Sequence, residues 1–420
     1  MLGKGAIAVL GLLVAAAAPA SDLSKYLHPA EPQFVLLQTG TTTTTRTSTS
    51  TTTTTSGGGG RVLARAVLTS GAEGYGAINL AYNPDKDEYL AVWVEDEGSS
   101  FAVYSRILNA EGVPATSAKE VSKSDVDCCN RIGLAYGGKD YLLSYTEADG
   151  NLAVRRVKSG TGSGLAKAVV IAPAGFGSAA AFDPDDNRYL VTYSDDSSAS
   201  FLQVVSNKGK KSGNPVALPG ASGSNQYQVN HVAYNATDQQ VLTVGVEING
   251  TKRRPVGLGF DDPLSHSAGP FVYSNKFVGS AINWVAAAFR DTGEGLAAWN
   301  IAAASSGSAF IRAIRSDGAP TGNAKKVGNG LPVNIFPVAE NLAEQNLIVW
   351  TDLNAAAVSG QEANDSAGLI GSSFRISDTS EQVSSGFNAA AYSSISGESG
   401  VLYTRAGASP AVAFALLSQP

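Results

Sequence analysis

A recurring pattern of apolar and polar positions runs through the chain from Ala77 onward. Its clearest form is INLAYNPDKDEYLAVW, Ile78 to Trp93, in which a short apolar run ends on an aromatic residue, polar turn residues follow, and a second apolar run begins. Two such runs around a polar turn predict a pair of antiparallel strands joined by a hairpin. Helical spacing of apolar residues is nearly absent, so the pattern indicates an all-β chain.

Four more clear copies of this phrase follow, and two weaker copies come after them. The clear copies begin at Ile132, Ser178, Asn230 and Val285, and the weaker ones at Phe336 and Asn388. One aromatic residue marks each copy except the sixth, where Glu340 takes its place: Tyr82, Tyr136, Phe182, Tyr234, Phe289 and Tyr392. The markers recur about every 50 residues, a period typical of repeat architectures built from small sheets.

Each unit continues with a third strand, such as Phe101 to Leu108, then a glycine turn and a short fourth strand. Four strands alone cannot bury both faces of their sheet, whereas seven sheets packed around an axis can. Across Ala77 to Pro420 the repeat resembles β-propeller blades, without the signature motifs of WD40, kelch or sialidase repeats. The resemblance implies a fold class, an all-β seven-bladed β-propeller with four-stranded blades, and implies nothing about function.

The two ends of the repeat region complement each other. The last unit stops after its third strand, Ala411 to Leu417, while Val62 to Leu68 is a spare strand before the first unit. We therefore expect the N-terminal strand to close the ring as the outer strand of the last blade.

The first 60 residues have a different composition. Residues 1–20 contain Lys4, an apolar run from Ala6 to Ala18 and a small-residue site ending at Ala20, which predicts a signal peptide cleaved after that residue. The run is shorter than the roughly 20 residues that span a bilayer, so no membrane span is expected. Residues 21–38 are interpreted as a tether, 39–60 as a Thr/Ser/Gly-rich disordered linker and 61–420 as the propeller. The predicted location is extracellular or associated with a cell wall.

The net charge and the motifs argue against several classes of function. A formal charge of −6 argues against nucleic acid as a partner, and the one dense basic cluster, Lys252 to Arg254, is interpreted as a solvated hairpin tip. His28, His231 and His266 lack metal-ligand spacing, and no P-loop, zinc-protease or serine-hydrolase motif occurs. We therefore assign no catalytic residue, no metal and no cofactor from the sequence.

The only cysteines, Cys128 and Cys129, are adjacent. In an oxidising compartment two thiols tend to be paired, so we predict a disulfide between these neighbours. The alternative is two reduced, partly buried thiols.

A set of asparagines lies in the segments that lead into the predicted inner strands: Asn130, Asn230, Asn283, Asn334 and Asn388. In a propeller these segments share a face with the loops between second and third strands, which are rich in Asp and Glu. Amides and carboxylates around one axis would hydrogen-bond sugar hydroxyls or hold a hard cation. The alternative is that they are ordinary turn residues.

Two further groups of polar residues have simpler interpretations. The hairpins Asn83-x-Asp85-x-Asp87 and Asp183-x-Asp185-x-Asn187 lack the glycine and glutamate of a calcium loop, so we interpret them as turns. The sequons at Asn235, Asn249 and Asn364 predict N-glycosylation if the host is a eukaryote.

The sequence favours a secreted, non-enzymatic binding module whose ligand is a carbohydrate or a surface protein. The alternatives are a secreted propeller glycoside hydrolase and a structural component of a wall or extracellular assembly. Aromatic residues exposed at the axis would favour sugar binding, and a close carboxylate pair would favour the hydrolase.

Overall fold

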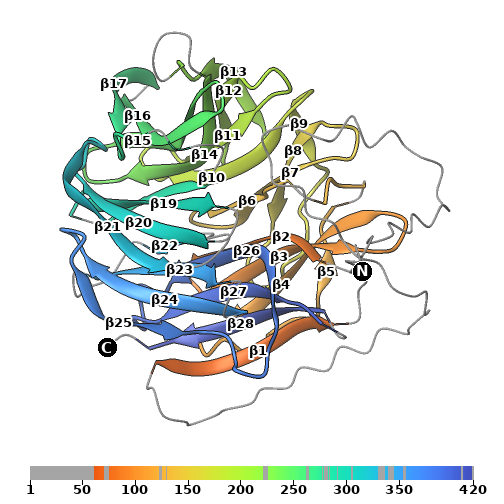
Figure 1. The fold of residues 1–420 in the computed structure, drawn as a ribbon. Coiled ribbons are helices and arrows are strands. Elements are labelled where there is room, and N and C mark those ends of the chain that lie inside the picture. The colour runs from red at the N-terminus through yellow and green to blue at the C-terminus, as the bar shows by residue number, and fades with distance from the viewer. Residues whose placement is uncertain are drawn as a thin grey trace, which may run out of the picture. The chain divides into compact units, whose positions relative to one another are not determined.

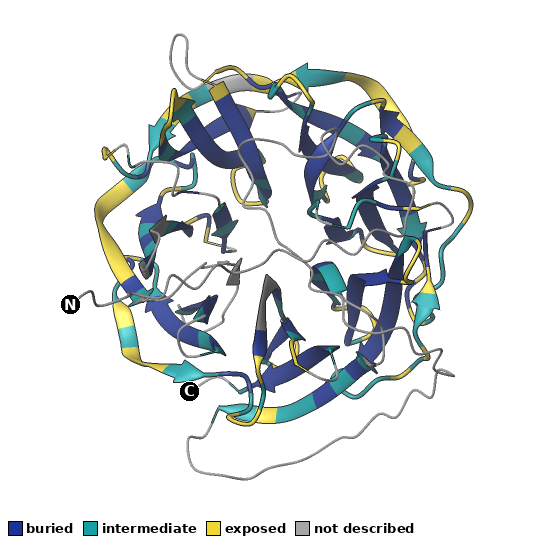
Figure 2. Cartoon of the chain, turned by 45° about the vertical axis from the view of Figure 1, so that its right-hand side comes forward, coloured by how far each residue is buried: buried dark blue, intermediate teal, exposed yellow. Residues whose placement is uncertain are grey.

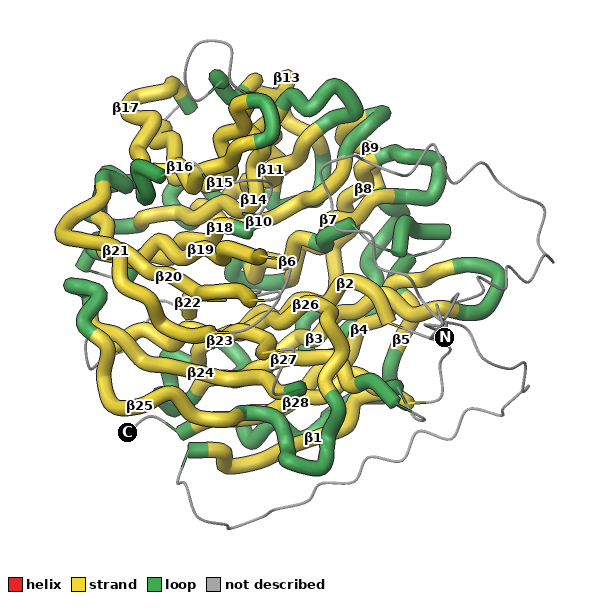
Figure 3. The backbone as a smooth tube through the Cα atoms, in the orientation of Figure 1, coloured by secondary structure: helices red, strands yellow, loops and turns green. Residues whose placement is uncertain are grey.

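The described part of the chain consists of strands and turns without a helix (Figure 3). The computed structural model describes residues 61–70, 75–122, 125–128, 130–220, 226–261, 264–276, 278, 282, 284–290, 292–303, 306–329, 336–338, 345–352, 356–407 and 410–418. Among these residues no helix is long and apolar enough to cross a membrane. The predicted signal peptide, tether and linker, residues 1–60, lie outside them.

The strands form seven antiparallel sheets of four strands each (Figure 1). From the axis outward, blade 1 is β2 (Tyr75–Asn83), β3 (Glu88–Asp96), β4 (Phe101–Asn109) and β5 (Lys119–Glu120). Blade 2 is β6 (Gly133–Tyr136), β7 (Tyr141–Thr146), β8 (Leu152–Val157) and β9 (Val169–Ala172). Blade 3 is β10 (Phe176–Asp183), β11 (Arg188–Ser194), β12 (Ser200–Ser206) and β13 (Lys211–Ala217).

The second half of the ring repeats this order. Blade 4 is β14 (Gln226–Asn235), β15 (Gln240–Asn249), β16 (Lys252–Asp261) and β17 (Ser265–Val272). Blade 5 is β18 (Val285–Phe289), β19 (Gly295–Ala303), β20 (Ser306–Ile314) and β21 (Pro320–Asn329). Blade 6 is β22 (Phe336–Val338), β23 (Gln345–Asp352), β24 (Ala357–Asn364) and β25 (Leu369–Arg375). Blade 7 is β26 (Val383–Tyr392), β27 (Ser399–Arg405), β28 (Ala411–Leu417) and β1 (Val62–Ser70).

The seven sheets close into a ring around an axis. Each inner strand contacts the inner strands of both neighbouring blades, in the order β2, β6, β10, β14, β18, β22, β26 and back to β2. Figure 2 shows the result: buried residues fill the blades, and exposed residues follow the outer strands. The predicted fold class, a seven-bladed propeller with four-stranded blades, is confirmed.

The N-terminal strand completes the last blade. β1 pairs antiparallel with β28, from Val62 opposite Leu417 to Ser70 opposite Ala411. Every residue of β28 is buried, so this strand would expose an apolar edge without its partner. The predicted closure of the ring by the N-terminal strand is confirmed.

The marker aromatics explain why the repeated phrase folds as a hairpin. Tyr82 lies directly opposite Tyr89 with ring centroids 5.1 Å apart, and Phe182 opposite Tyr189 at 5.0 Å. Such cross-strand aromatic pairs stabilise a sheet and fix its register. In the turn between the strands, the side chain of Asn83 accepts a hydrogen bond from the backbone N–H of Asp85 at 2.9 Å, as expected of a turn residue.

Arginines on the third strands connect neighbouring blades. Arg106 donates to the carbonyl of Leu68 in β1, Arg155 to that of Val121 beyond β5, and Arg312 to that of Tyr273 beyond β17. Gln203 and Gln361 occupy the same position in blades 3 and 6 and donate instead to their own outer strands. Backbone carbonyls at the ends of outer strands thus receive side-chain donors, which keeps buried polar groups satisfied.

Candidate functional site

The segments that lead into the inner strands share one face with the loops between second and third strands. The N–H of Asp127 donates to the carbonyl of Thr146 at 2.9 Å, and that of Gly175 to the carbonyl of Gly150 at 3.0 Å. We call this side the inlet face. It is the face on which the sequence placed the candidate asparagines.

Two of these asparagines are buried and connect blades. Asn230 is 3% exposed, and its Oδ1 accepts a hydrogen bond from the N–H of Val285 in blade 5 at 3.1 Å. Asn388 is 1% exposed, and its Nδ2 donates to Oγ1 of Thr351 in blade 6 at 2.7 Å. Both amides thus stabilise the ring.

Asn130 has its partner within its own loop. Asn130 is partly exposed, and its Nδ2 donates to Oδ2 of Asp127 at 2.8 Å, which holds the loop before blade 2. Asn283 and Asn334 lie outside the described residues. A ligand-binding role for the five asparagines stays a prediction.

Several acidic side chains of the inlet face also have internal partners. Glu95 accepts from Nε1 of Trp93 at 3.0 Å, Glu97 accepts from the hydroxyl of Tyr104, and the fully buried Glu247 pairs with Arg254. Arg253 of the basic cluster is 6% exposed, so the interpretation of this cluster as a solvated tip was wrong for that residue. Its guanidinium donates to the carbonyl of Ile282 because the side chain turns inward.

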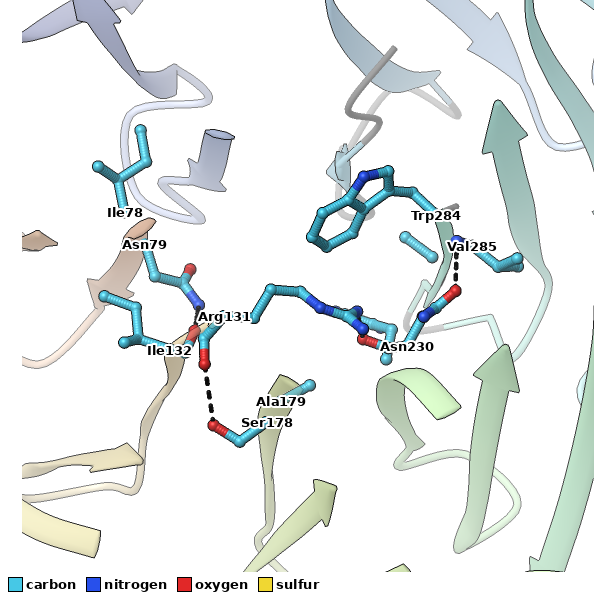
Figure 4. A pocket seen from close by; sticks show the side chains of 11 residues that line it. Ile78, Asn79, Arg131, Ile132, Ser178, Ala179, Asn230, Trp284 and Val285 are labelled. Carbon is cyan, nitrogen blue, oxygen red and sulfur yellow. Dashed lines mark hydrogen bonds between the residues drawn. The ribbon is translucent and has the colours of Figure 1, made fainter. Parts of the chain in front are cut away.

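A cavity lies on the axis of the propeller, between the inner strands of blades 1 to 5 (Figure 4). Its polar lining consists of Asn79, Arg131, Ser178, Asn230 and His231, and Trp284 borders it together with apolar residues. Arg131 and Trp284 come just before the inner strands β6 and β18 and so approach the cavity from the inlet face. Asn79, Asn230 and His231 lie in the middle of β2 and β14.

Arg131 extends across this cavity from blade 2. Its Nη1 donates to the carbonyl of Asn230 in blade 4 at 2.5 Å, and its guanidinium lies 4.3 Å from the ring centroid of Trp284, just before blade 5 (Figure 4). A guanidinium over an indole face is attracted by the ring quadrupole. The pair thus fixes the orientation of a tryptophan that is only partly buried.

The size of the cavity decides what can enter it. Its volume is about 30 Å³, enough for one or two water molecules. A sugar ring is far larger than this volume.

Among the described residues of the lining, His231 carries a titratable ring. Burial and the nearby charge of Arg131 lower the pKa of His231 from 6.5 to about 4. Its imidazole is therefore neutral in the folded protein at neutral pH.

This shift predicts a pH dependence of stability. The unfolded chain binds a proton at His231 near pH 6.5 and the folded chain only near pH 4, so the contribution of the neutral ring is complete above about pH 6.5 and declines toward pH 4. We expect the free energy of unfolding to fall by at most about 1.4 kcal/mol per pH unit from this group. Urea unfolding between pH 7.5 and 5 should show a smaller decline for His231→Phe than for the wild type. Equal declines would contradict the assignment.

The three sequons differ in exposure. Asn235 is fully buried, and its Nδ2 donates to the carbonyl of Ser316 at 3.0 Å. Asn249 is exposed at the tip of the β15–β16 hairpin, and Asn364 is partly exposed. A glycan on Asn235 would be incompatible with the native packing of that amide.

We therefore expect a eukaryotic secretory host to produce folded protein that carries a glycan at Asn249 and none at Asn235. Mass spectrometry of the glycopeptides measures this, and Asn249→Gln should remove the corresponding glycan. A glycan found on Asn235 in correctly folded protein would contradict the structure.

The described residues do not test the predicted disulfide. Cys128 is partly buried, and Cys129 lies outside them. A bond between the two stays a prediction, which mass spectrometry of the non-reduced peptide can test.

Sequence reasoning missed Arg131 and Trp284. Both stand five residues before the marker aromatic of their unit, Tyr136 and Phe289, where the third unit has Gly177. An alignment of the repeats at this position shows three large residues, Arg131, Trp284 and, in the seventh unit, Phe387.

The sequence matches no protein-family model and no curated protein. Its fold is similar to that of the BP39L lectin from Burkholderia pseudomallei, with a TM-score of 0.56 at 16% identity over 80% of this chain and 94% of that chain. The polysaccharide lyase Uly1 gives 0.54 at 10% identity over 82% and 90%, and the hydrazine synthase of Kuenenia stuttgartiensis gives 0.50 at 10% identity over 78% and 92%. At these identities the likeness concerns the fold alone, and it agrees with the topology: the described domain is a seven-bladed β-propeller.

Proposed function

We propose that the chain is an extracellular carbohydrate-binding module whose ligand lies at the inlet face, against Trp284. The observation that supports this is the pair formed by Trp284 and Arg131 at the axis, a partly exposed indole held in place among amide and hydroxyl groups. Sugar recognition combines an apolar platform with a few well-placed polar groups, and this region offers both.

The fold is compatible with such a role. Two of the solved structures that share it are a lectin and a polysaccharide lyase. Residues 1–20 would direct the chain out of the cell, and the linker 39–60 would separate the propeller from whatever the N-terminal segment contacts.

The proposal is binding without cleavage. Glycoside hydrolysis uses two carboxyl groups on either side of the scissile bond. The described residues that line the axial cavity include no carboxylate, and the inlet-face acids named above have internal partners. A surface protein that carries glycans would be bound through the same site.

The test is a glycan array probed with the purified protein, followed by calorimetry on the strongest oligosaccharide. Trp284→Ala should weaken binding by at least about tenfold, since truncating a central aromatic anchor typically costs about 2 kcal/mol or more. Trp284→Phe keeps a flat apolar ring and should retain most of the affinity.

Lys210→Gln, in the exposed turn between β12 and β13 on the opposite face, is the control and should leave binding unchanged. The proposal fails if no glycan binds at millimolar concentration, or if Trp284→Ala binds as tightly as the wild type while remaining folded.

A further inference from the structure

The backbone of Trp284 is held by a buried asparagine of its own blade. Asn300, in β19, is 0% exposed, and its Oδ1 accepts a hydrogen bond from the N–H of Trp284 at 3.0 Å. The N–H of Asn300 donates in turn to the carbonyl of Trp284 at 3.3 Å. The paired residues of β18 and β19 begin only at Val285, opposite Trp299. Asn300 thus fixes a residue that lies just outside the strand.

A second asparagine reaches the same backbone from the neighbouring blade. Oδ1 of Asn230, in β14, accepts a hydrogen bond from the N–H of Val285 at 3.1 Å. This N–H belongs to the same peptide unit as the carbonyl of Trp284. Both peptide units that flank the Cα atom of Trp284 are therefore bonded to buried asparagines. Because a residue has only two soft backbone dihedrals, these bonds fix the direction in which the indole leaves the backbone.

A β-bulge directs Asn230 toward blade 5. The register of β14 against β15 shifts between Val229 and His231, so Asn230 is the extra residue of β14 at this point. A bulge changes the direction of a side chain, and bulges are frequent next to functional sites. Gly245, opposite Val229, is required here, because a Cβ atom on it would lie 2.1 Å from the carbonyl oxygen of Gln228.

The same bulge presents backbone acceptors to Arg131. The guanidinium of Arg131 donates to the carbonyl oxygens of Asn230 at 2.5 Å and Val229 at 3.5 Å. It also lies 4.3 Å from the centroid of the indole of Trp284. Asn230 is thus connected to Trp284 by two routes, through the N–H of Val285 and through the cation at the ring.

We propose that Asn230 and Asn300 are positioning residues for the glycan-binding surface. They hold the indole of Trp284 in one orientation before the ligand arrives, so that binding does not have to order this side chain. The effect on glycan affinity rests on the proposed function, whereas the orientation of the indole does not.

The orientation of the indole is measured without ligand. The chain has four tryptophans, and Trp284 is the one that is partly exposed, since Trp93, Trp299 and Trp350 are at most 3% exposed. A protein labelled with 5-fluorotryptophan gives one fluorine signal per tryptophan, and Trp284→Phe identifies the signal of Trp284. In the wild type we expect this signal to be single and as narrow as those of the buried rings. A broad or divided signal in the wild type would overturn the proposal without any variant.

Two variants remove the contacts. Asn230→Ala and Asn300→Ala should broaden or divide the signal of Trp284, because the indole then samples several orientations. Both should weaken binding of the oligosaccharide selected from the array by about two- to tenfold, the cost of ordering one side chain on binding. Asn230→Asp keeps an oxygen acceptor for the N–H of Val285 and should restore the narrow signal and most of the affinity.

Asn235→Ala is the matched control. Asn235 lies at the opposite end of β14, is 0% exposed, and its Nδ2 donates to the carbonyl of Ser316 in blade 5 at 3.0 Å. This variant also removes a buried amide between blades 4 and 5, so it should lower the midpoint of thermal unfolding similarly. The signal of Trp284 and the glycan affinity should stay unchanged.

The outcomes separate the two claims. An unchanged Trp284 signal in Asn230→Ala and Asn300→Ala would overturn the positioning role, and so would a changed signal with unchanged affinity. Equal changes in Asn235→Ala would assign the effect to a general loss of stability and would also overturn it. If the wild type binds no glycan, the proposed function fails, while the fluorine spectra still decide whether the two asparagines fix the indole.

Discussion

A protein that lacks residues 61–70 is expected not to form the native propeller at temperatures at which the intact chain is folded. Without β1, the fully buried strand β28 loses its outer partner, and the backbone groups of Ala411 to Leu417 that pair with β1 have nothing to bond. The free energy of unfolding of a globular domain is only about 5–15 kcal/mol. We expect this deletion to remove most of that stability. Circular dichroism during thermal unfolding measures the loss.

Two controls make this result specific. Removal of ten residues of the predicted linker, 42–51, shortens the chain equally and should leave the midpoint unchanged. A synthetic peptide of residues 61–70 added to the deleted protein should restore part of the stability, since the pairing is noncovalent. An unchanged midpoint without β1 would contradict the closure of the ring by this strand.

Arg106→Met is expected to destabilise the same junction by about 2–4 kcal/mol, because it leaves buried carbonyl groups without a donor. The register of β1 against β28 shifts between Val67 and Thr69, and the carbonyl of Leu68 at this shift accepts from Nη1 of Arg106 at 2.5 Å. Nε of Arg106 also donates to the carbonyl of Thr116 at 2.7 Å. One side chain thus connects blade 1 to the strand that closes blade 7.

Arg315 provides the comparison. Its side chain is 62% exposed and pairs with Asp317 on the surface, so Arg315→Met should cost less than about 0.5 kcal/mol. Urea unfolding of both variants separates the two cases. Similar losses for Arg106→Met and Arg315→Met would show that the interblade contact contributes nothing beyond a surface arginine.

The blades were predictable because their signal is local. Tyr82 and Tyr89 lie within one phrase, and their cross-strand contact depends only on a short hairpin. The weaker sixth copy also forms an inner strand, β22, whose described residues are Phe336–Val338. Closure of the ring was predictable because the sequence has a spare strand before the first unit, Val62 to Leu68, while the last unit stops after its third strand, Ala411 to Leu417.

Contacts between blades were not predictable, because they depend on how neighbouring sheets are placed. Asn230 looked like one of five equivalent loop amides, yet it is buried and bonded to the backbone of blade 5. Arg131 and Trp284 are far apart in the sequence and meet only when five blades surround one axis. The repeated phrase predicts the strands of each blade. The candidate site instead depends on residues that are not repeated, such as Arg131 and Trp284.

A crystal structure of the propeller with the best oligosaccharide from the array would test the central claim most directly. We expect a sugar ring stacked on Trp284 at the inlet face, outside the cavity, with Arg131 still in contact with the carbonyl of Asn230. Sugar bound elsewhere, between the outer parts of two blades or on the opposite face, would contradict the proposed site and leave Trp284 with a structural role only.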